Sequence, residues 1–180
     1  MIDATHLRNI LGHYPTGVSV VTAIDEVGEP AGMVVGSFTS VSLDPPLIAY
    51  FASRTSGSYA KLQSSSHFCV NVLAHDQREL CQRFSRKTGN KFDGTRWAPS
   101  PSGSPILDGV LAWIDCEVDS IVPAGDHWMV MGRITGLGVA NDDVPMVFAR
   151  GSFGCFAESS SESAGLVEAD VWQLSGLLGA

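Results

Sequence analysis

The chain consists largely of short apolar runs, each about as long as a β-strand, separated by residues that favour turns. Many such runs with only brief helices between them predict an antiparallel sheet, whereas a parallel sheet would need regular strand–helix alternation. The expected strands cover residues 16–25, 31–43, 47–52, 67–74, 110–124, 127–140 and 145–156. We therefore predict a mainly β fold, an antiparallel β-barrel with short decorating helices.

Apolar residues at helical spacing predict short helices between these strands. The expected helices cover residues 4–12, 59–62 with Ser56 or Ser58 as N-cap, and 75–89 with its end at Gly89. Residues 94–109 are rich in Pro, Ser and Gly, which predicts a long surface loop that contains Trp97.

Length, composition and charge restrict the class of protein. A chain of 180 residues, 44% of them hydrophobic, can form one domain with a large core. The formal net charge of −8 excludes a nucleic-acid partner, because binding to the phosphate backbone needs clustered Lys and Arg. Residues 1–17 lack the features of a signal peptide, and no run approaches the ~18 apolar residues of a membrane span. We expect a cytoplasmic protein with no membrane contact.

The sequence contains little that indicates a metal site or one of the common nucleotide-binding or hydrolase motifs. Cys69, Cys81, Cys116 and Cys155 are far apart and form no CxxC, so we expect buried free thiols rather than disulfides or a metal site. The histidines show no paired ligand spacing, and the GxGxxG, P-loop, GxSxG and HExxH motifs are missing. If the protein is an enzyme, a bound organic cofactor is expected to supply the chemistry.

Residues 36–52, GSFTSVSLDPPLIAYFA, place hydroxyls and a glycine at the start of an apolar strand. Gly36 would let a flat ring approach the backbone, and the N–H groups of residues 35–37 would bond the ring edge. Residues 53–58, SRTSGS, place hydroxyls and a guanidinium at a helix start, where free N–H groups favour a phosphate. The alternative is an ordinary half-exposed strand with alternating polar and apolar residues.

Five segments in order carry a family resemblance: YPTGVSVVTA, GMVVGSFTSVSLDPPL, HFCVNVLAHDQRELCQRFS, NKFDG and PAGDHWMVMGRI. Together they resemble the flavin reductase domain family, the FMN-binding split barrels that include the reductase components of two-component flavin monooxygenases. The resemblance extends over residues 4–156. We therefore assign residues 1–156 to one split-barrel domain and residues 157–180 to a C-terminal tail.

The resemblance implies a homodimer of Greek-key split barrels that bind FMN or FAD and transfer hydride to it from NADH or NADPH. The reduced flavin would pass to a separate flavin-dependent monooxygenase. By position, the flavin ring lies against Val34, Val35, Gly36 and Ser37, while Ser53, Arg54, Ser56 and Ser58 meet the ribityl chain and phosphate. Ser85, Arg86, Lys91 and Phe92 would close the site.

His127 follows PAGD and is expected near the nicotinamide, as the catalytic residue. There it would donate a hydrogen bond to the carboxamide or stabilise negative charge on the reduced flavin. For each of these site residues the alternative is an ordinary surface hydroxyl, a solvated charge or a structural histidine.

Two positions depart from the family pattern. Val34 stands where family members often have Thr or Ser, and Ser152 stands where a bulkier residue is more common. The first removes a potential hydroxyl contact to the flavin, and the second alters how the nicotinamide side is covered.

Two other functions are compatible with the same residues: a flavin-binding electron carrier without nicotinamide-dependent turnover, and a structural barrel with an empty pocket. The residues are equally compatible with NADH and NADPH as the donor and with FMN and FAD as the flavin. They are also compatible with either a prosthetic or a diffusible flavin. In the tail, residues 157–164 favour a flexible link, whereas Val167, Val171, Leu174 and Leu178 have the spacing of a helix. We expect that helix to dock on the barrel or across the dimer, with a disordered tail as the alternative.

Overall fold

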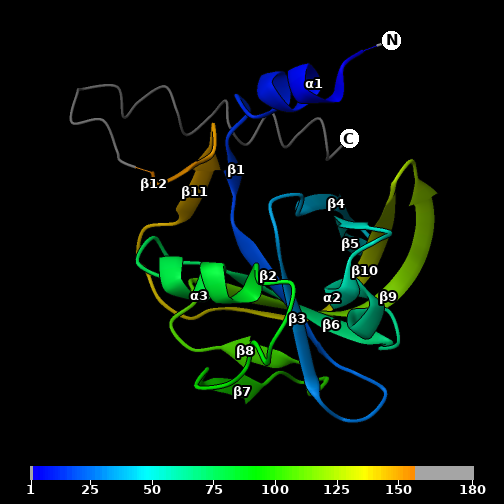
Figure 1. Ribbon diagram of the computed structural model, residues 1–180. Coiled ribbons are helices and arrows are strands. Elements are labelled where there is room, and N and C mark those ends of the chain that lie inside the picture. Colours follow the sequence, from blue (N-terminus) through cyan, green and yellow to red (C-terminus); the bar gives the residue numbers. More distant parts are fainter. Residues whose placement is uncertain (1, 157–180) are drawn as a thin grey trace.

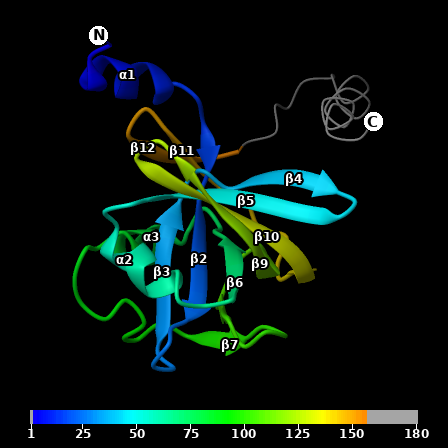
Figure 2. The same ribbon diagram turned by 90° about the vertical axis from the view of Figure 1, so that its right-hand side faces the viewer.

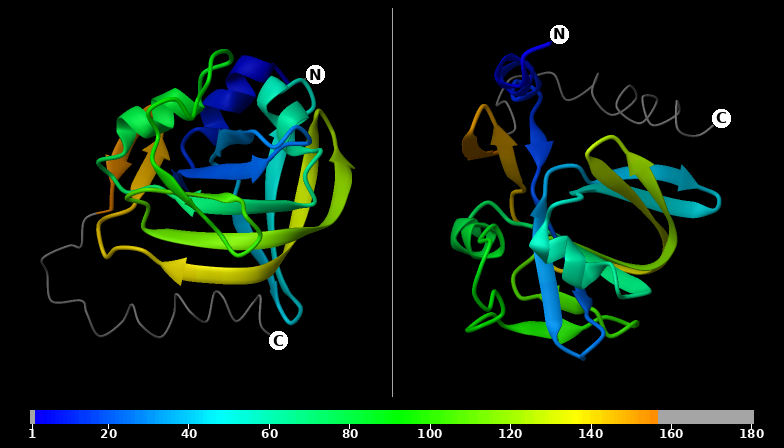
Figure 3. Two further views of the ribbon diagram at one scale, coloured as in Figure 1. Left: turned by 90° about the horizontal axis from the view of Figure 1, so that it is seen from below. Right: turned by 45° about the vertical axis from the view of Figure 1, so that its right-hand side comes forward.

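A computed structural model describes residues 2–156 of the protein. Its main feature is an antiparallel sheet of seven strands in the order β3-β2-β6-β9-β10-β5-β4. These strands are β2 Ser19–Ile24, β3 Pro30–Val35, β4 Thr39–Leu43, β5 Pro46–Ser53, β6 His67–Val72, β9 Ala112–Ala124 and β10 His127–Val139. The sheet curls until β3 also contacts β5, and Figure 3 shows the long curved ribbon of β9 and β10 in yellow-green and yellow. The mainly β, antiparallel barrel predicted from the sequence is confirmed.

Strand β2, which lies between β3 and β6, is buried on both faces, and this divides the interior into two cores. Successive side chains of a strand point to opposite faces. Val21 packs in the barrel with Tyr50 and Phe68, whereas Val20 packs on the other face with Phe84 and other residues around α3. Strand β2 therefore does not need to alternate polar and apolar residues, because its side chains are buried on both faces.

Within residues 2–156, three helices and two small sheets complete the fold. The helices are α1 Ala4–Leu11, α2 Gly57–Leu62 and α3 Arg78–Phe84; the small sheets consist of β1 Thr16–Gly17 with β11 Met146–Ala149 and β12 Ser152–Cys155, and of β7 Trp97–Pro99 with β8 Pro105–Leu107. Helix α1 lies at one end of the molecule and the β7–β8 hairpin at the opposite end (Figure 1).

Helices α2 and α3 both lie beside β3 (Figure 2). A glycine on β3 makes the approach of α3 possible, because a Cβ atom on Gly32 would lie 2.6 Å from the Phe84 ring. The two helices and β3 thereby enclose the part of the surface where most of the expected site residues lie.

Several expected boundaries are wrong. Residues 94–109 contain the β7–β8 hairpin rather than only a loop, and residues 145–156 form two strands rather than one. The latter break falls at Arg150 and Gly151, whose φ angles of 51° and 78° turn the chain.

The remaining differences lie around the site. Residues 31–43 form β3 and β4 with a break between them, and α3 ends at Phe84, well before Gly89. Ser56 is the N-cap of α2, since its Oγ accepts a hydrogen bond from the Tyr59 N–H at 3.2 Å. Ser58 lies inside the first turn and has another partner, described below.

Cys69, Cys81 and Cys116 are buried free thiols as expected, whereas Cys155 is a free thiol on the surface. Burial, with a smaller contribution from the nearby Asp115 carboxyl group, raises the pKa of the Cys69 and Cys116 thiols to about 12. Over the described residues, no helix is long and apolar enough to span a bilayer.

Candidate active site

Two adjoining clefts lie between β3, α2 and the segment that follows α3. The first, which we call the serine-rich cleft, has a volume of about 500 Å³ and is lined by Met33, Val34, Ser53, Thr55, Ser56, Gly57, Ser58, Phe84, Ser85, Arg86, Lys87 and Lys91. The second, the lysine cleft, has a volume of about 590 Å³ and is lined by residues 29–32, Gly57, Ser58, Lys61 and residues 87–92. The clefts share Gly57, Ser58, Lys87 and Lys91, so one ligand can extend through both.

Lys91 stands at the junction of the two clefts. Its Nζ donates to the Gly32 carbonyl at 3.0 Å, to the Phe84 carbonyl at 2.8 Å and to the Ser58 hydroxyl at 2.5 Å. These bonds use all the N–H groups of the ammonium and join β3, α2 and the end of α3. Because the Ser58 oxygen accepts from Lys91, the Ser58 proton is left to point toward a ligand.

The charges around the clefts favour an anion. Arg86, Lys87 and Lys91 line the serine-rich cleft without a carboxylate, and Glu29 is the acidic residue in the lining of the lysine cleft. Burial lowers the pKa of the Lys91 ammonium, and the nearby positive charge of Lys61 lowers it further. An anionic ligand would compensate the charges of Lys61 and Lys91, and it would thereby remove the lowering of the Lys91 pKa by Lys61.

The hydroxyls of the serine-rich cleft come from the turn between β5 and α2. Ser53 Oγ lies 3.1 Å from Thr55 Oγ1, and Ser56 caps the helix. At the far wall, the Ser85 hydroxyl donates to the Cys81 carbonyl at 2.8 Å, which leaves its oxygen as an acceptor. Met33, Val34 and Phe84 add apolar surface to the same cleft. The lining thus combines cations and hydroxyls with an apolar wall.

His127 lies at the start of β10, directly opposite Ser53 on β5. Its Nδ1 is 2.7 Å from an Asp126 carboxylate oxygen, and this hydrogen bond, with the charge of a protonated His127, holds the pKa of Asp126 below its usual value. Next to this pair, the Arg54 guanidinium stacks over the Trp128 ring at 4.5 Å. His127 and Arg54 therefore lie beyond the Ser53 edge of the serine-rich cleft rather than in its lining.

The structure brings together most of the residues predicted from the sequence. Those that line the serine-rich cleft are Val34, Ser53, Ser56, Ser58, Ser85, Arg86 and Lys91, while Phe92 lines the lysine cleft. Phe92 is also 8% exposed and packs edge-on against Phe84, so its role in the core is independent of any ligand.

Val35, Gly36 and Ser37 line neither cleft. Val35 is buried in the barrel, and the Ser37 hydroxyl exchanges hydrogen bonds with the backbone N–H and carbonyl of Phe51. A Cβ atom on Gly36 would lie 2.9 Å from Thr16 Oγ1, so the glycine has a packing reason of its own.

Sequence reasoning missed several lining residues, above all Lys61 and Lys87. Lys61 lies one helical turn after Gly57 on α2, and Lys87 lies in the segment after α3. A signal was present in the sequence, because this chain contains only three lysines and all of them lie between residues 61 and 91.

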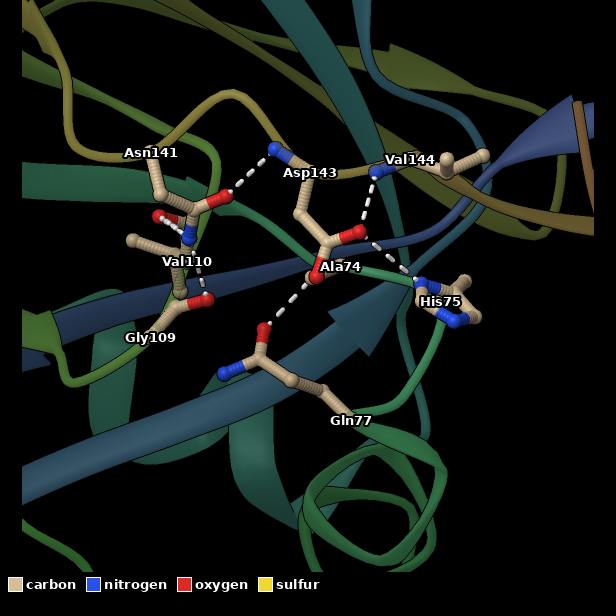
Figure 4. Close-up of polar contacts among 8 residues, drawn as sticks. All are labelled: Ala74, His75, Gln77, Gly109, Val110, Asn141, Asp143 and Val144. Carbon is tan, nitrogen blue, oxygen red and sulfur yellow. Dashed lines mark hydrogen bonds and ion pairs between the residues drawn. The ribbon is translucent and has the colours of Figure 1, made fainter.

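Among the described residues, His75, Asp76 and Asp143 form one group that could hold a metal ion, although the sequence predicts none. All three are exposed, and Figure 4 shows that Asp143 already has partners within the chain. Its carboxylate accepts from the Val144 N–H at 2.7 Å and lies 3.3 Å from His75 Nδ1. These contacts tie the β10–β11 connection to the end of β6, so we assign the group a structural role.

The antiparallel barrel carries, beside β3 and α2, two clefts whose cations and hydroxyls suit an anionic ligand. The chain belongs to the flavin reductase like domain family, whose model matches residues 11–156. It is 49% identical to a flavin reductase of Pseudomonas putida over 87% of this chain and 92% of that protein. It is 43% identical to HsaB, the reductase subunit of a flavin-dependent monooxygenase of Rhodococcus jostii, over 84% of this chain and 77% of that protein.

Solved structures agree with this assignment. The Streptomyces globisporus NADH:FAD oxidoreductase SgcE6, in complex with NAD and FAD fragments, has a TM-score of 0.82 and 31% identity, and the match covers 88% of this chain and 96% of that one. A nitrilotriacetate monooxygenase component B homologue from Mycobacterium thermoresistibile has a TM-score of 0.82 and 36% identity, over 92% of this chain and 94% of that one.

Proposed function

We propose that this protein is an NAD(P)H-dependent flavin reductase that supplies reduced FMN or FAD to a separate flavin-dependent monooxygenase. Membership of the flavin reductase like domain family supports the reaction, as do relatives named as reductase components of two-component monooxygenases. The observation on which we rely most is the lining of the serine-rich cleft, where cations and hydroxyls adjoin apolar surface.

The residues present fit a flavin nucleotide. Arg86, Lys87 and Lys91 match the charge of its phosphate, and the free proton of Ser58 matches a phosphate oxygen. Met33 and Val34 match the apolar ring system. A valine at position 34 leaves backbone groups, rather than a side-chain hydroxyl, to bond the ring edge. When bound, the flavin supplies the two-electron redox chemistry, with a reduced nicotinamide as the donor.

Each group of residues then has a distinct task. The cations and hydroxyls of the serine-rich cleft hold the phosphate and thereby fix the position of the ring. We assign His127 to the nicotinamide side, where it would donate a hydrogen bond from Nε2 while Asp126 holds Nδ1. Asp126 would thus orient the imidazole, a positioning role that the sequence did not reveal.

We also propose that the protein is a homodimer. Helix α1 supports this, because Leu7, Ile10 and Leu11 share one face, yet no residue of the helix is buried. Their exposed fractions of 45%, 56% and 62% are high for apolar side chains at helical spacing. A second copy of the chain would cover this face, and we treat it as the dimer contact.

The proposal is tested by mixing purified protein with NADH or NADPH and following the loss of nicotinamide absorbance with and without added flavin. A reductase oxidises the nicotinamide when FMN or FAD is present, and adding an oxygenase is not required. Protein that binds flavin tightly but does not oxidise either nicotinamide would instead be an electron carrier. Protein that binds no flavin would contradict both functions.

A further inference from the structure

The lysines of this chain are concentrated in a way that its overall charge does not predict. The sequence contains three lysines and has a net charge of −8, yet Lys61, Lys87 and Lys91 all line the lysine cleft. None of the ion pairs formed among residues 2–156 involves a lysine. Their positive charges are therefore available to a ligand in this cleft.

Like charges held this close repel one another. The effect is visible at Lys91, whose pKa is lowered by burial and then by the charge of Lys61. Arg86 adds a further cation in the adjoining serine-rich cleft, and Glu29 is the acidic residue that offsets them in the combined lining. One phosphate in the serine-rich cleft would leave the charge of Lys61 uncompensated, since Lys61 lines only the lysine cleft.

We propose that the lysine cleft binds the adenosine 5′-phosphate half of FAD, so that this enzyme binds FAD more tightly than FMN. The inference rests on the proposed flavin reductase function and names its preferred flavin. FMN ends at its single phosphate, whereas FAD continues through a second phosphate to an adenosine. Because the two clefts share Ser58, Lys87 and Lys91, the pyrophosphate can pass over this junction and place its second phosphate near Lys61.

The rest of the lysine cleft suits an adenosine. Its walls include the apolar side chains of Pro30 and Phe92, and Asn90 adds an amide that can bond a base or a ribose. The lysine cleft has a volume of about 590 Å³, larger than that of the serine-rich cleft. This is more space than a terminal phosphate alone needs. A nicotinamide dinucleotide also carries a pyrophosphate, but we place the nicotinamide at His127, which lines neither cleft.

The test compares the dissociation constants of FMN and FAD by quenching of flavin fluorescence, without nicotinamide. Lys61 and Arg86 form a matched pair, because each lines one cleft alone. We expect Lys61→Gln to weaken FAD about tenfold and leave FMN unchanged, as for the loss of one charge-assisted hydrogen bond. Arg86→Gln should weaken FMN and FAD alike. The charge control Arg8→Gln on α1, outside both clefts, should change neither.

Added AMP, which is the half of FAD that FMN lacks, should compete with FAD for the wild-type protein but leave FMN binding intact. The assignment is overturned if wild-type protein binds both flavins equally, if Lys61→Gln weakens them to the same extent, or if Lys61→Gln weakens NADH binding and not FAD binding. Each of these outcomes leaves the proposed reductase function standing. Protein that binds neither flavin refutes the proposed function itself.

Discussion

Lys91 connects the two clefts mainly through its charge, because its N–H groups are already bonded to Gly32, Phe84 and Ser58. A ligand phosphate therefore meets the ammonium indirectly, through the Ser58 hydroxyl and the electrostatic field. The field of a partly buried cation is screened less than that of an exposed one. Removing the charge should thus weaken phosphate binding even though the direct contacts of Lys91 lie within the protein.

The affinity of the site for a phosphate should therefore depend on pH, and the direction of the change can be derived. A lysine is charged below its pKa, and the pKa of Lys91 lies below its ordinary value of 10.5. As the pH rises through the lowered pKa, the cation is lost and the affinity for a phosphate falls. Between that pKa and the second pKa of the phosphate, about 6, the affinity is constant. We expect the ratio of FMN affinity to riboflavin affinity to decrease in this range, because riboflavin has the same ring but no phosphate.

Calorimetric or fluorescence titrations at a series of pH values measure this ratio. In Lys91→Gln the ratio should be lower at neutral pH and depend less on pH, because that variant has no charge to lose at this position. A wild-type ratio that stays constant up to the ordinary lysine range would contradict the role of Lys91.

His127 makes a second prediction at the scale of one residue. Because it lies beyond the edge of the serine-rich cleft, His127→Ala should reduce kcat/KM for the nicotinamide by about tenfold or more and leave flavin affinity unchanged. Steady-state kinetics and flavin titration separate the two effects. His75→Ala is the matched control, since His75 lies in the network of the β10–β11 connection, and should alter neither quantity. A loss confined to flavin affinity would place His127 on the wrong side of the site.

The sequence predicts site residues where they belong to a continuous motif. Ser53, Ser56 and Ser58 are close in sequence and meet in one cleft, as do Ser85, Arg86 and Lys91. Lys61 has no motif around it, and only the packing of α2 against β3 brings it next to Lys91. Conversely, Gly36 fits the pattern of a ligand-contacting glycine, but its nearest neighbour is Thr16 on β1.

At the scale of elements, a buried amide holds the β7–β8 hairpin against the barrel. Asn71 on β6 is fully buried, and its Oδ1 accepts from the Leu107 N–H at 2.8 Å while its Nδ2 donates to the Pro105 carbonyl at 3.2 Å. Thr22 on β2 also donates to the Pro105 carbonyl, at 2.5 Å. These side chains replace the strand partner that β8 lacks on this side.

We expect Asn71→Leu to lower the free energy of unfolding by about 2–3 kcal/mol, because the Leu107 N–H is left buried without a partner. Chemical denaturation measures the change. Asn141→Leu is the matched control: its amide donates to the Gly109 and Val110 carbonyls in a more exposed setting, where water can replace it (Figure 4). That variant should lose about 1 kcal/mol or less. A loss in Asn71→Leu as small as that expected for Asn141→Leu would show that the hairpin does not depend on Asn71.

The same contacts explain which elements the sequence could predict. The long strands β9 and β10 follow from their apolar residues, and their predicted bounds differ from the observed ones by only a few residues. The β7–β8 hairpin has only three residues in each strand, so its pattern is too short to distinguish from a loop. It depends on Asn71 and on the buried Asp115, whose carboxylate accepts from Ser100 and Ser102. Such partners are distant in sequence, and local patterns do not reveal them.

At the scale of the whole molecule, charge and apolar surface are distributed unevenly. The chain has a net charge of −8, while four cations surround the joined clefts. A flavin nucleotide is itself an anion, so the net charge opposes its approach and the local field favours it where Lys61, Arg86, Lys87 and Lys91 gather. This contrast directs the ligand to the clefts.

Among residues 2–156, nothing covers the apolar surface of α1. A helix of eight residues is marginal in water unless one face packs against a partner, and Leu7, Ile10 and Leu11 share an exposed face. The N-cap Asp3, which accepts from the His6 N–H at 2.8 Å, and the bond from the Arg150 N–H to the Gly12 carbonyl at 2.7 Å hold only its ends. We infer that a second copy of the chain covers this face.

Ile10→Glu should therefore weaken the dimer. The substitution places a carboxylate in an apolar contact, and in a two-fold symmetric dimer it does so twice, so we expect the dimer dissociation constant to rise by about a hundredfold. Sedimentation velocity over a range of protein concentrations measures it. Asn9→Glu adds the same charge to the opposite face of α1 and should leave the dimer intact, because residues 9 and 10 point in different directions on a helix. A wild-type protein that sediments as a monomer, or an Ile10→Glu variant that dimerises as well as Asn9→Glu, would contradict this assignment of the contact.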